Sequence, residues 1–390
     1  MISAEFIYVM ISAAVTFFFP LFSIPLNLFG LVFLKKTRRV FAFLLALSLA
    51  LVAYAWDPPV KADLYRHHLE MGTISGYSIT QLFKHALKEL NFIQIFTEFI
   101  VSKTGNHDFL QLVIVLLGYY EMFWIVCDYV EKKNIRSPVV AMALIILIVS
   151  LKFIDFASGL WFYFAVINFA LGVYLKYFRN TKKLHYLFYV ISILSHISLL
   201  YIVIMVLLMK VIAPFKKANW ISLVVMFLVF SGIGFLIDYA YTHFDFYLVT
   251  VLEKMYQSYF LQGRLSGLIM GWNLYLAIIN IACGVLVTVL YQRHEKNEYN
   301  SFILVAAVSS LALMLQSNVF TRFAFLIVLL AIIPFMEIMN VKILSRSKLL
   351  VILCFSIMVG LNVSRQVEQI KEYDLLNNVL DSIIETGGNV

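Results

Sequence analysis

Residues 35–59 read KKTRRVFAFLLALSLALVAYAWDPP. The segment begins with a basic run, continues as an apolar stretch over residues 40–56, and ends with an aspartate and two prolines. About 20 mostly apolar residues span a membrane as a helix, basic residues mark its cytoplasmic end, and a pair of prolines stops a helix. The stretch therefore predicts a membrane helix that starts at the cytoplasmic face and ends at the outer face.

The composition of the whole chain extends this prediction. Of its 390 residues, 62% are hydrophobic and only 13% are charged, whereas roughly 25% are charged in an ordinary soluble domain. We therefore expect an all-α, polytopic integral membrane bundle of about 11 to 12 membrane segments, forming a single domain over residues 1–390. The net charge of +8 comes from basic runs between apolar segments, a pattern that orients a membrane protein and predicts no nucleic-acid partner.

The first apolar segment, residues 6–34, lacks the basic start of a cleaved signal peptide and is too long for one. We expect it to be a retained membrane helix. Cys127, Cys283 and Cys354 are far apart and form no CxxC pair, so we expect small hydrophobic side chains rather than metal or redox ligands. The further segments are residues 40–56, 109–128, 138–154, 159–175, 185–213, 219–238, 267–291, 300–316, 321–340 and 347–363.

Residues 185–213 decide which side the later loops face. If every segment crossed the membrane once, the basic runs before and after this one would lie on opposite sides, against the rule that such runs are cytoplasmic. We interpret the segment as two short crossings or a re-entrant hairpin with His196 near its outer tip, because broken helices are tolerated where they line a cavity. The alternative is one long tilted helix in which Ser195 and His196 bond across a helix interface.

With the hairpin, the N-terminus and the loops 57–108 and 239–266 face outward, as does a polar C-terminal tail over residues 364–390. Apolar residues at helical spacing within residues 79–100 predict an amphipathic helix lying on the membrane surface. Residues 239–260 are a second candidate for such a helix.

The first outer loop brings an acid, a base, an aromatic ring and an imidazole together, at Asp63, Tyr65, Arg66 and His67. The two preceding prolines place them just past the membrane face, where a lipid headgroup lies. The plainer interpretation is a solvated loop with an incidental ion pair between Asp63 and Arg66. His67 and His68 are adjacent, which is not metal-ligand spacing on a helix, so no metal ion is expected.

A second set consists of lone ionisable residues in or beside apolar segments, which are costly near a bilayer and often mark substrate paths. It comprises Asp155, His196, Arg264 and Arg322. Plainer interpretations are a buried, hydrogen-bonded histidine for His196, a loop charge for Arg264 and a snorkelling helix-end arginine for Arg322. With the hairpin, all of them face outward together with Asp63, which favours a shared site.

The sequence contains no P-loop, GxGxxG, GxSxG or DxD motif. Nothing in it therefore predicts a reaction that consumes a nucleotide, or a cofactor. A lipid-borne donor is the natural substitute for a site that faces outward.

These features together resemble the EpsG-like branch of the Wzy-type polysaccharide polymerases, bacterial membrane enzymes that join lipid-linked oligosaccharide repeat units. The resemblance rests on Asp63-Leu64-Tyr65-Arg66, the helix from Gly159 to Gly172, His196-Ile197-Ser198, and downstream arginines like Arg264 and Arg322. By hydropathy and order it spans most of the chain. Members often carry an arginine near the start of the middle helix, where this chain has Leu160-Trp161-Phe162.

The resemblance implies that an undecaprenyl-diphosphate-linked glycan is the donor, and that a hydroxyl group of a second lipid-linked repeat unit attacks its anomeric carbon without a metal ion or cofactor. Arginines suit the diphosphate, and an acid or imidazole suits the general base. Aromatic rings such as Tyr65 and Trp161 are candidates for stacking on sugars, although packing is the plainer role. The candidates are Asp63 and His196 for the base, and Arg66, His67, Tyr65, Arg264, Arg322 and Asp155 for binding the diphosphate or glycan.

The implied location is the bacterial cytoplasmic membrane, with the site facing the periplasm or cell exterior. The implied partners are membrane lipids and lipid-linked glycans, with a chain-length regulator and a flippase as candidate protein partners. Three other functions fit the same pattern: a glycosyltransferase that uses a sugar on polyprenyl phosphate, a repeat-unit ligase, and, outside the enzymes, a lipid-linked oligosaccharide flippase.

Overall fold

The computed structural model describes residues 4–179, 181, 183–203, 206, 220–232, 239, 242–243, 271–293, 295, 297–314, 317–341, 346–377 and 379. Within these residues all of the regular secondary structure is helical, which confirms the all-α class. The chain divides into two compact units, residues 1–199 with 363–390 (unit 1) and residues 200–362 (unit 2), and each is described by itself. The expectation of a single domain stays a prediction.

Several of the described helices are long and apolar enough to cross a membrane. This agrees with a helical membrane protein, while the number of crossings stays a prediction. The spans are α7 (Phe109–Lys133), α10 (Leu160–Tyr174) with the π-helical turn Leu175–Arg179, α17 (Trp272–Gln292), Phe320–Asn340 within α19 (Ser317–Asn340), and α20 (Arg346–Glu372).

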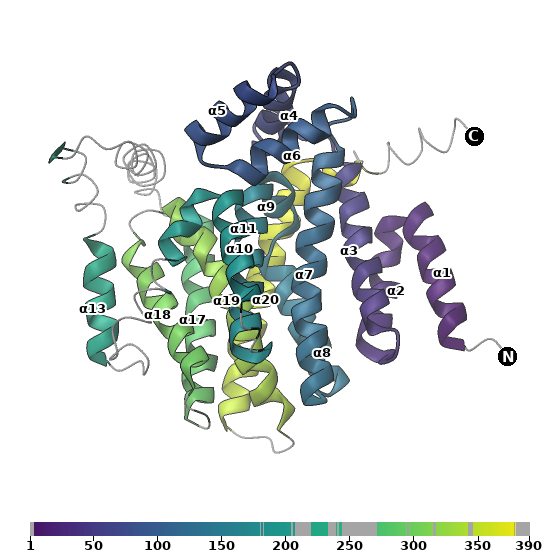
Figure 1. Cartoon of the computed structure of the whole chain (residues 1–390). Coiled ribbons are helices and arrows are strands. Elements are labelled where there is room, and N and C mark those ends of the chain that lie inside the picture. The colour runs from purple at the N-terminus through teal and green to yellow at the C-terminus, as the bar shows by residue number, and fades with distance from the viewer. Residues whose placement is uncertain are drawn as a thin grey trace. The chain divides into compact units, whose positions relative to one another are not determined.

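The expectation of one helix over residues 6–34 is wrong. The chain forms α1 (Ala4–Phe18) and α2 (Pro20–Phe33), with Phe19 in a non-helical conformation between them. Proline favours the first turn of a helix, because it lacks the N–H that a helix interior needs. The two helices pack on each other: the Tyr8 hydroxyl donates to the Leu26 carbonyl at 3.0 Å. In unit 1 the N-terminus and the turn into α3 (Arg38–Tyr54) consequently lie at the same end (Figure 1).

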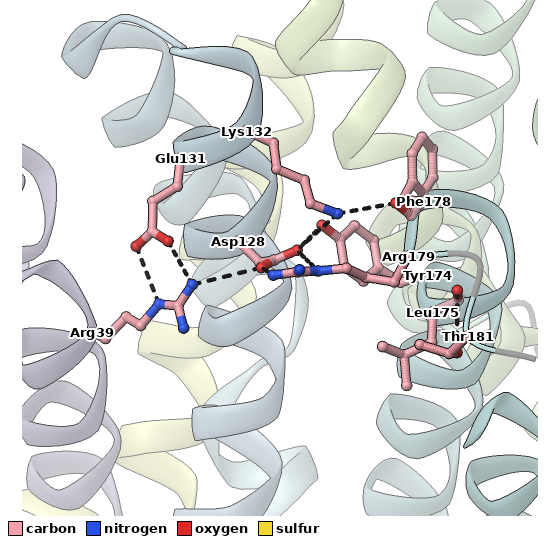
Figure 2. A network of polar contacts seen from close by, with 9 residues as sticks. All are labelled: Arg39, Asp128, Glu131, Lys132, Tyr174, Leu175, Phe178, Arg179 and Thr181. Atoms are coloured by element: carbon pink, nitrogen blue, oxygen red, sulfur yellow. Dashed lines mark hydrogen bonds and ion pairs between the residues drawn. The ribbon is translucent and has the colours of Figure 1, made fainter.

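One end of unit 1, here called the basic end, carries the basic residues at 35–39, 132–136 and 176–179. It is held together around Asp128 near the end of α7, whose side chain is 1% exposed (Figure 2). Arg179 and Tyr174 donate hydrogen bonds to this carboxylate, and Arg39 from the start of α3 lies 3.6 Å from it. The ion pairs therefore join three helices where the sequence predicted cytoplasmic basic runs.

The opposite end of unit 1 carries three helices, here called the cap: α4 (Asp63–Ile74), α5 (Ile79–Glu89) and α6 (Phe92–Ser102) (Figure 1). The expectation of one amphipathic helix over residues 79–100 is wrong. Leu90 adopts a left-handed conformation, φ 57°, and ends α5, so that α6 folds back on it. Buried Leu82, Ala86 and Ile95 form the core between the two helices. The predicted helix is thus two helices that pack on each other, and Ile79, Phe83 and Leu87 of α5 stay exposed, so contact with a membrane surface stays a prediction.

The first part of the predicted polar tail is helical, because α20 continues to Glu372. The end of this helix binds other parts of unit 1. The Gln366 amide donates to the carbonyls of Ile148 and Val149, at the end of α8 (Ser137–Ser150), at 3.2 and 2.9 Å. Glu372 pairs with Lys61, beside the cap, at 2.9 Å. The Gln366 bonds give partners to carbonyls at the end of α8, which have none within that helix. Together with the Lys61–Glu372 pair, they hold the polar end of α20 against unit 1.

The predicted break at His196 is present. The helix α11 (Leu184–Ser195) ends one residue earlier, His196 is extended, and the short 3-10 helix Ile197–Leu199 follows. One continuous helix through this point is therefore excluded. The return to the cytoplasmic side stays a prediction, because residues 207–219 lie outside those described.

Unit 2 contains α13 (Trp220–Ser231), α17, α18 (Glu298–Ala312) and α19, with the first part of α20. Gly284 of α17 lets Ile327 of α19 approach closely: a Cβ at this glycine would meet the isoleucine side chain at 2.8 Å. Of the predicted outer loop 239–266, and of the surface helix expected at 239–260, only residues 239, 242 and 243 are described.

Candidate functional site

Asp63 is the first residue of α4, at the point where the chain leaves the non-helical Pro58-Pro59 segment. The first N–H groups of a helix have no partner within it. The backbone N–H of Asp63 instead donates to the Ser158 hydroxyl at 3.0 Å. Ser158 is the last residue of α9 (Phe153–Ser158), here called the base of the cap, so this bond holds the start of α4 against α9.

Asp63 and Arg66 form an ion pair at 2.8 Å, and their side chains are 39% and 70% exposed. The structure therefore brings together two of the predicted site residues at the accessible start of α4. Tyr65 lies between them in the chain and is partly exposed. All three project from the cap, where a charged ligand can reach them.

His67 lies one residue beyond and is buried. Its Nδ1 atom is 3.0 Å from Oε1 of Glu98 on α6, and its Nε2 atom is 3.8 Å from Asp63. Burial lowers the pKa of His67, but the hydrogen bond and the charge of Glu98 outweigh burial, so the pKa lies above its ordinary value. The sequence analysis missed Glu98, since no spacing in the chain connects it with His67.

Glu98 also accepts a hydrogen bond from the Trp161 indole nitrogen at 2.8 Å. Its side chain is fully buried, and within the part of the chain that the structure describes its second oxygen, Oε2, has no hydrogen-bond partner. Trp161 is buried as well, so the packing role is confirmed and a sugar cannot stack on its ring. The start of α10, where the sequence has Leu160-Trp161-Phe162, thus supplies a neutral donor to a buried acid.

His68 faces a different neighbour. Its Nε2 atom is 3.2 Å from the Gln111 amide oxygen on α7, and burial lowers its pKa. Adjacent helical residues point in different directions. The two histidines therefore belong to separate groups, as expected from their spacing.

His196 is buried, with Nδ1 2.7 Å from the Ser198 hydroxyl and its ring edge-on to Phe162. The next backbone N–H, of Ile197, donates to Asn91 between α5 and α6 at 3.2 Å. His196 thus lies at the cap end of unit 1. Burial and the bond to Ser198 match the plainer interpretation, a hydrogen-bonded buried histidine.

Asp155 on α9 is occupied by protein partners. Its oxygens lie 2.9 Å from Lys152 and 2.6 Å from the Gln369 amide of α20. Asp155 therefore holds the end of α20 against α9. It lies on the same short helix as Ser158, the partner of Asp63, and so belongs to the base of the cap.

Arg322 lies in α19 of unit 2 and is partly buried. Arg264 lies outside the described residues. The roles expected for these two arginines stay predictions from the sequence.

No protein-family model, curated protein or solved structure matches this chain.

Proposed function

We propose that the chain is a membrane glycosyltransferase that polymerises undecaprenyl-diphosphate-linked oligosaccharide repeat units, in O-antigen, capsule or exopolysaccharide synthesis. The observation that carries the proposal is the accessible Asp63–Arg66 pair on the cap, opposite the basic end of the same unit. If the basic end is cytoplasmic, the pair faces outward, where lipid-linked repeat units are joined.

The proposed reaction is a single displacement. The oxygen of an acceptor hydroxyl forms a bond to the anomeric carbon, the bond from that carbon to the diphosphate oxygen breaks, and its electron pair leaves with the lipid diphosphate. Asp63 accepts the hydroxyl proton. Between the two predicted bases, the exposed carboxylate of Asp63 favours it over the buried His196.

Arg66 stabilises the charge that the diphosphate acquires, because a guanidinium group offers forked donors and stays protonated. Its side chain is the more exposed of the pair and can turn from Asp63 to an anionic ligand. Tyr65 is placed to contact the glycan. Arg264 and Arg322 are proposed as further diphosphate ligands on the grounds of the sequence resemblance.

The test replaces Asp63 with Asn and, separately, Arg66 with Ala in the native host, and measures polymer length by gel electrophoresis. We expect single repeat units to accumulate, since each variant lacks a group needed for transfer. The matched control is His68→Asn, a neighbour on α4 bonded to Gln111 instead. Polymer of normal length from both test variants, at normal protein level, would refute the site.

The same experiment separates the alternatives. Loss of a flippase leaves no sugar at the surface, whereas loss of a polymerase leaves single capped units. Supplying lipid-linked single sugars or whole repeat units to membranes distinguishes a polyprenyl-phosphate-sugar transferase from a polymerase. A ligase differs in its acceptor alone.

A further inference from the structure

We propose that His67, Glu70 and Glu98 bind one divalent transition-metal ion that joins α4 to α6. One donor atom of each residue lies within 4.8 Å of the other two. Donors sharing a tetrahedral metal ion, at bonds of about 2.1 Å, are about 3.4 Å apart. His67 and Glu98 already meet this spacing at 3.0 Å, and Glu70, with its side chain 28% exposed, has room to close the rest.

The unpartnered oxygen of Glu98 is the second observation that points to a ligand. Its side chain is fully buried, Oε1 contacts His67 and Trp161, and Oε2 has no hydrogen-bond partner among the described residues. Buried charges in proteins are paired or coordinate metals, because an uncompensated carboxylate is costly away from water. A cation held by the three donors would compensate this buried carboxylate.

The charges around the cluster favour a cation. Within the part of the chain that the structure describes, the ion-pair partners of Glu70 and Glu98 are histidines, His85 and His67 respectively, and neither acid has a lysine or arginine partner. The buried acid of the basic end, Asp128, differs in being paired with an arginine. Two carboxylates with no lysine or arginine beside them, within the described residues, suit a divalent cation.

The neighbours of the three donors are those that orient metal ligands. Ligating side chains are usually held by hydrogen bonds from a surrounding group, and a ligating histidine by a carboxylate at its other nitrogen. Trp161 donates to Glu98 at 2.8 Å, His85 lies 3.1 Å from Glu70, and Asp63 lies 3.8 Å from the outward nitrogen of His67. Glu98 and Glu70 thus each have a positioning partner within hydrogen-bond distance.

One imidazole and two carboxylates suit Zn²⁺ or Mn²⁺, and three protein ligands leave a position for water. Such an ion would clamp α4, which carries Asp63 and Arg66, to α6. The inference does not require the proposed reaction, because metal binding is measured without any glycan.

The test uses the full chain, purified in detergent with an affinity tag free of histidine, stripped with EDTA, incubated with ZnSO₄ and desalted. Zinc is measured by mass spectrometry. We expect one zinc ion per chain in the parent protein and its loss in Glu70→Gln and Glu98→Gln. Glu89→Gln, at the end of α5, is the matched control and should keep the ion. Trp161→Phe should bind zinc about 10-fold more weakly, since Glu98 loses its positioning donor.

A parent protein that retains no zinc overturns the proposal, as does zinc bound equally by the parent and by Glu70→Gln. Glu70→Gln decides the question if Glu98→Gln fails to fold, because Glu70 is partly exposed. Normal zinc binding by an Arg66→Ala protein that no longer polymerises glycans would show that the two proposals stand separately.

Discussion

The carboxylate of Glu98 accepts a hydrogen bond from the indole nitrogen of Trp161 at 2.8 Å, which ties the cap to the first turn of α10. The same carboxylate oxygen lies 3.0 Å from His67 on α4. One buried acid of α6 therefore links this helix to α4 and α10, and α4 carries the exposed Asp63–Arg66 pair.

Asp155 should contribute to stability rather than to the reaction, because both its oxygens are occupied by Lys152 and Gln369. We expect Asp155→Asn to lower the free energy of unfolding by about 1–2 kcal/mol, the cost of weakened hydrogen bonds to a charged group. Polymer synthesis per amount of folded protein should stay normal. Thermal unfolding in detergent and polymer length in the host are the measurements. If folded Asp155→Asn protein made as little polymer as Asp63→Asn, Asp155 would be a residue of the proposed active site.

Asp128 should be the most sensitive position of the basic end. Its buried carboxylate accepts hydrogen bonds from Arg179 and Tyr174, so Asp128→Asn weakens them and should cost about 1.5–3 kcal/mol, while the exposed arginine side chains stay solvated. Glu131→Gln is the control: that side chain is 35% exposed and pairs with Arg39 at the surface, so its loss should cost less than about 1 kcal/mol. Denaturation monitored by circular dichroism gives both values. Equal effects would contradict the central role of Asp128.

Gly172 should tolerate no larger side chain. A Cβ there would lie 2.7 Å from the Tyr189 ring and 3.1 Å from the His185 carbonyl, so α10 and α11 could not approach as they do. We expect Gly172→Val to destabilise the protein by about 1–3 kcal/mol through overpacking. Gly72→Ala in α4, where a Cβ meets nothing within 4 Å, should instead stabilise it by about 0.5–1 kcal/mol. Melting temperatures of the two variants should move in opposite directions.

The fold-back of α1 and α2 predicts which side the N-terminus faces. Single cysteines at Glu5 and Lys36 should be labelled from the same side of a sealed membrane vesicle, and a cysteine at Thr104, just beyond the cap, from the other. The measurement is labelling by an impermeant maleimide in a background without Cys127, Cys283 and Cys354. Labelling of positions 5 and 36 from opposite sides would contradict the fold-back and support the single helix predicted over residues 6–34.

Local patterns in the sequence were sufficient for some of the helices of unit 1. Residues 40–56 and 109–128 appear as α3 and α7, and the polar step at His196 ends α11. Hydropathy and charge act through the solvent that each residue meets, so they can be read along the chain without knowing its partners.

The tertiary structure alone decided the turn at Phe19, the division of the cap into α5 and α6, and the meeting of His67, Glu70 and Glu98. Each depends on contacts between residues far apart in the chain. In the sequence, Glu98 is one polar residue of a predicted amphipathic helix. In the folded chain it is buried, and His67 and Trp161 are its partners. Burial, which the chain acquires only on folding, makes Glu98 the centre of a cluster with His67 and Trp161.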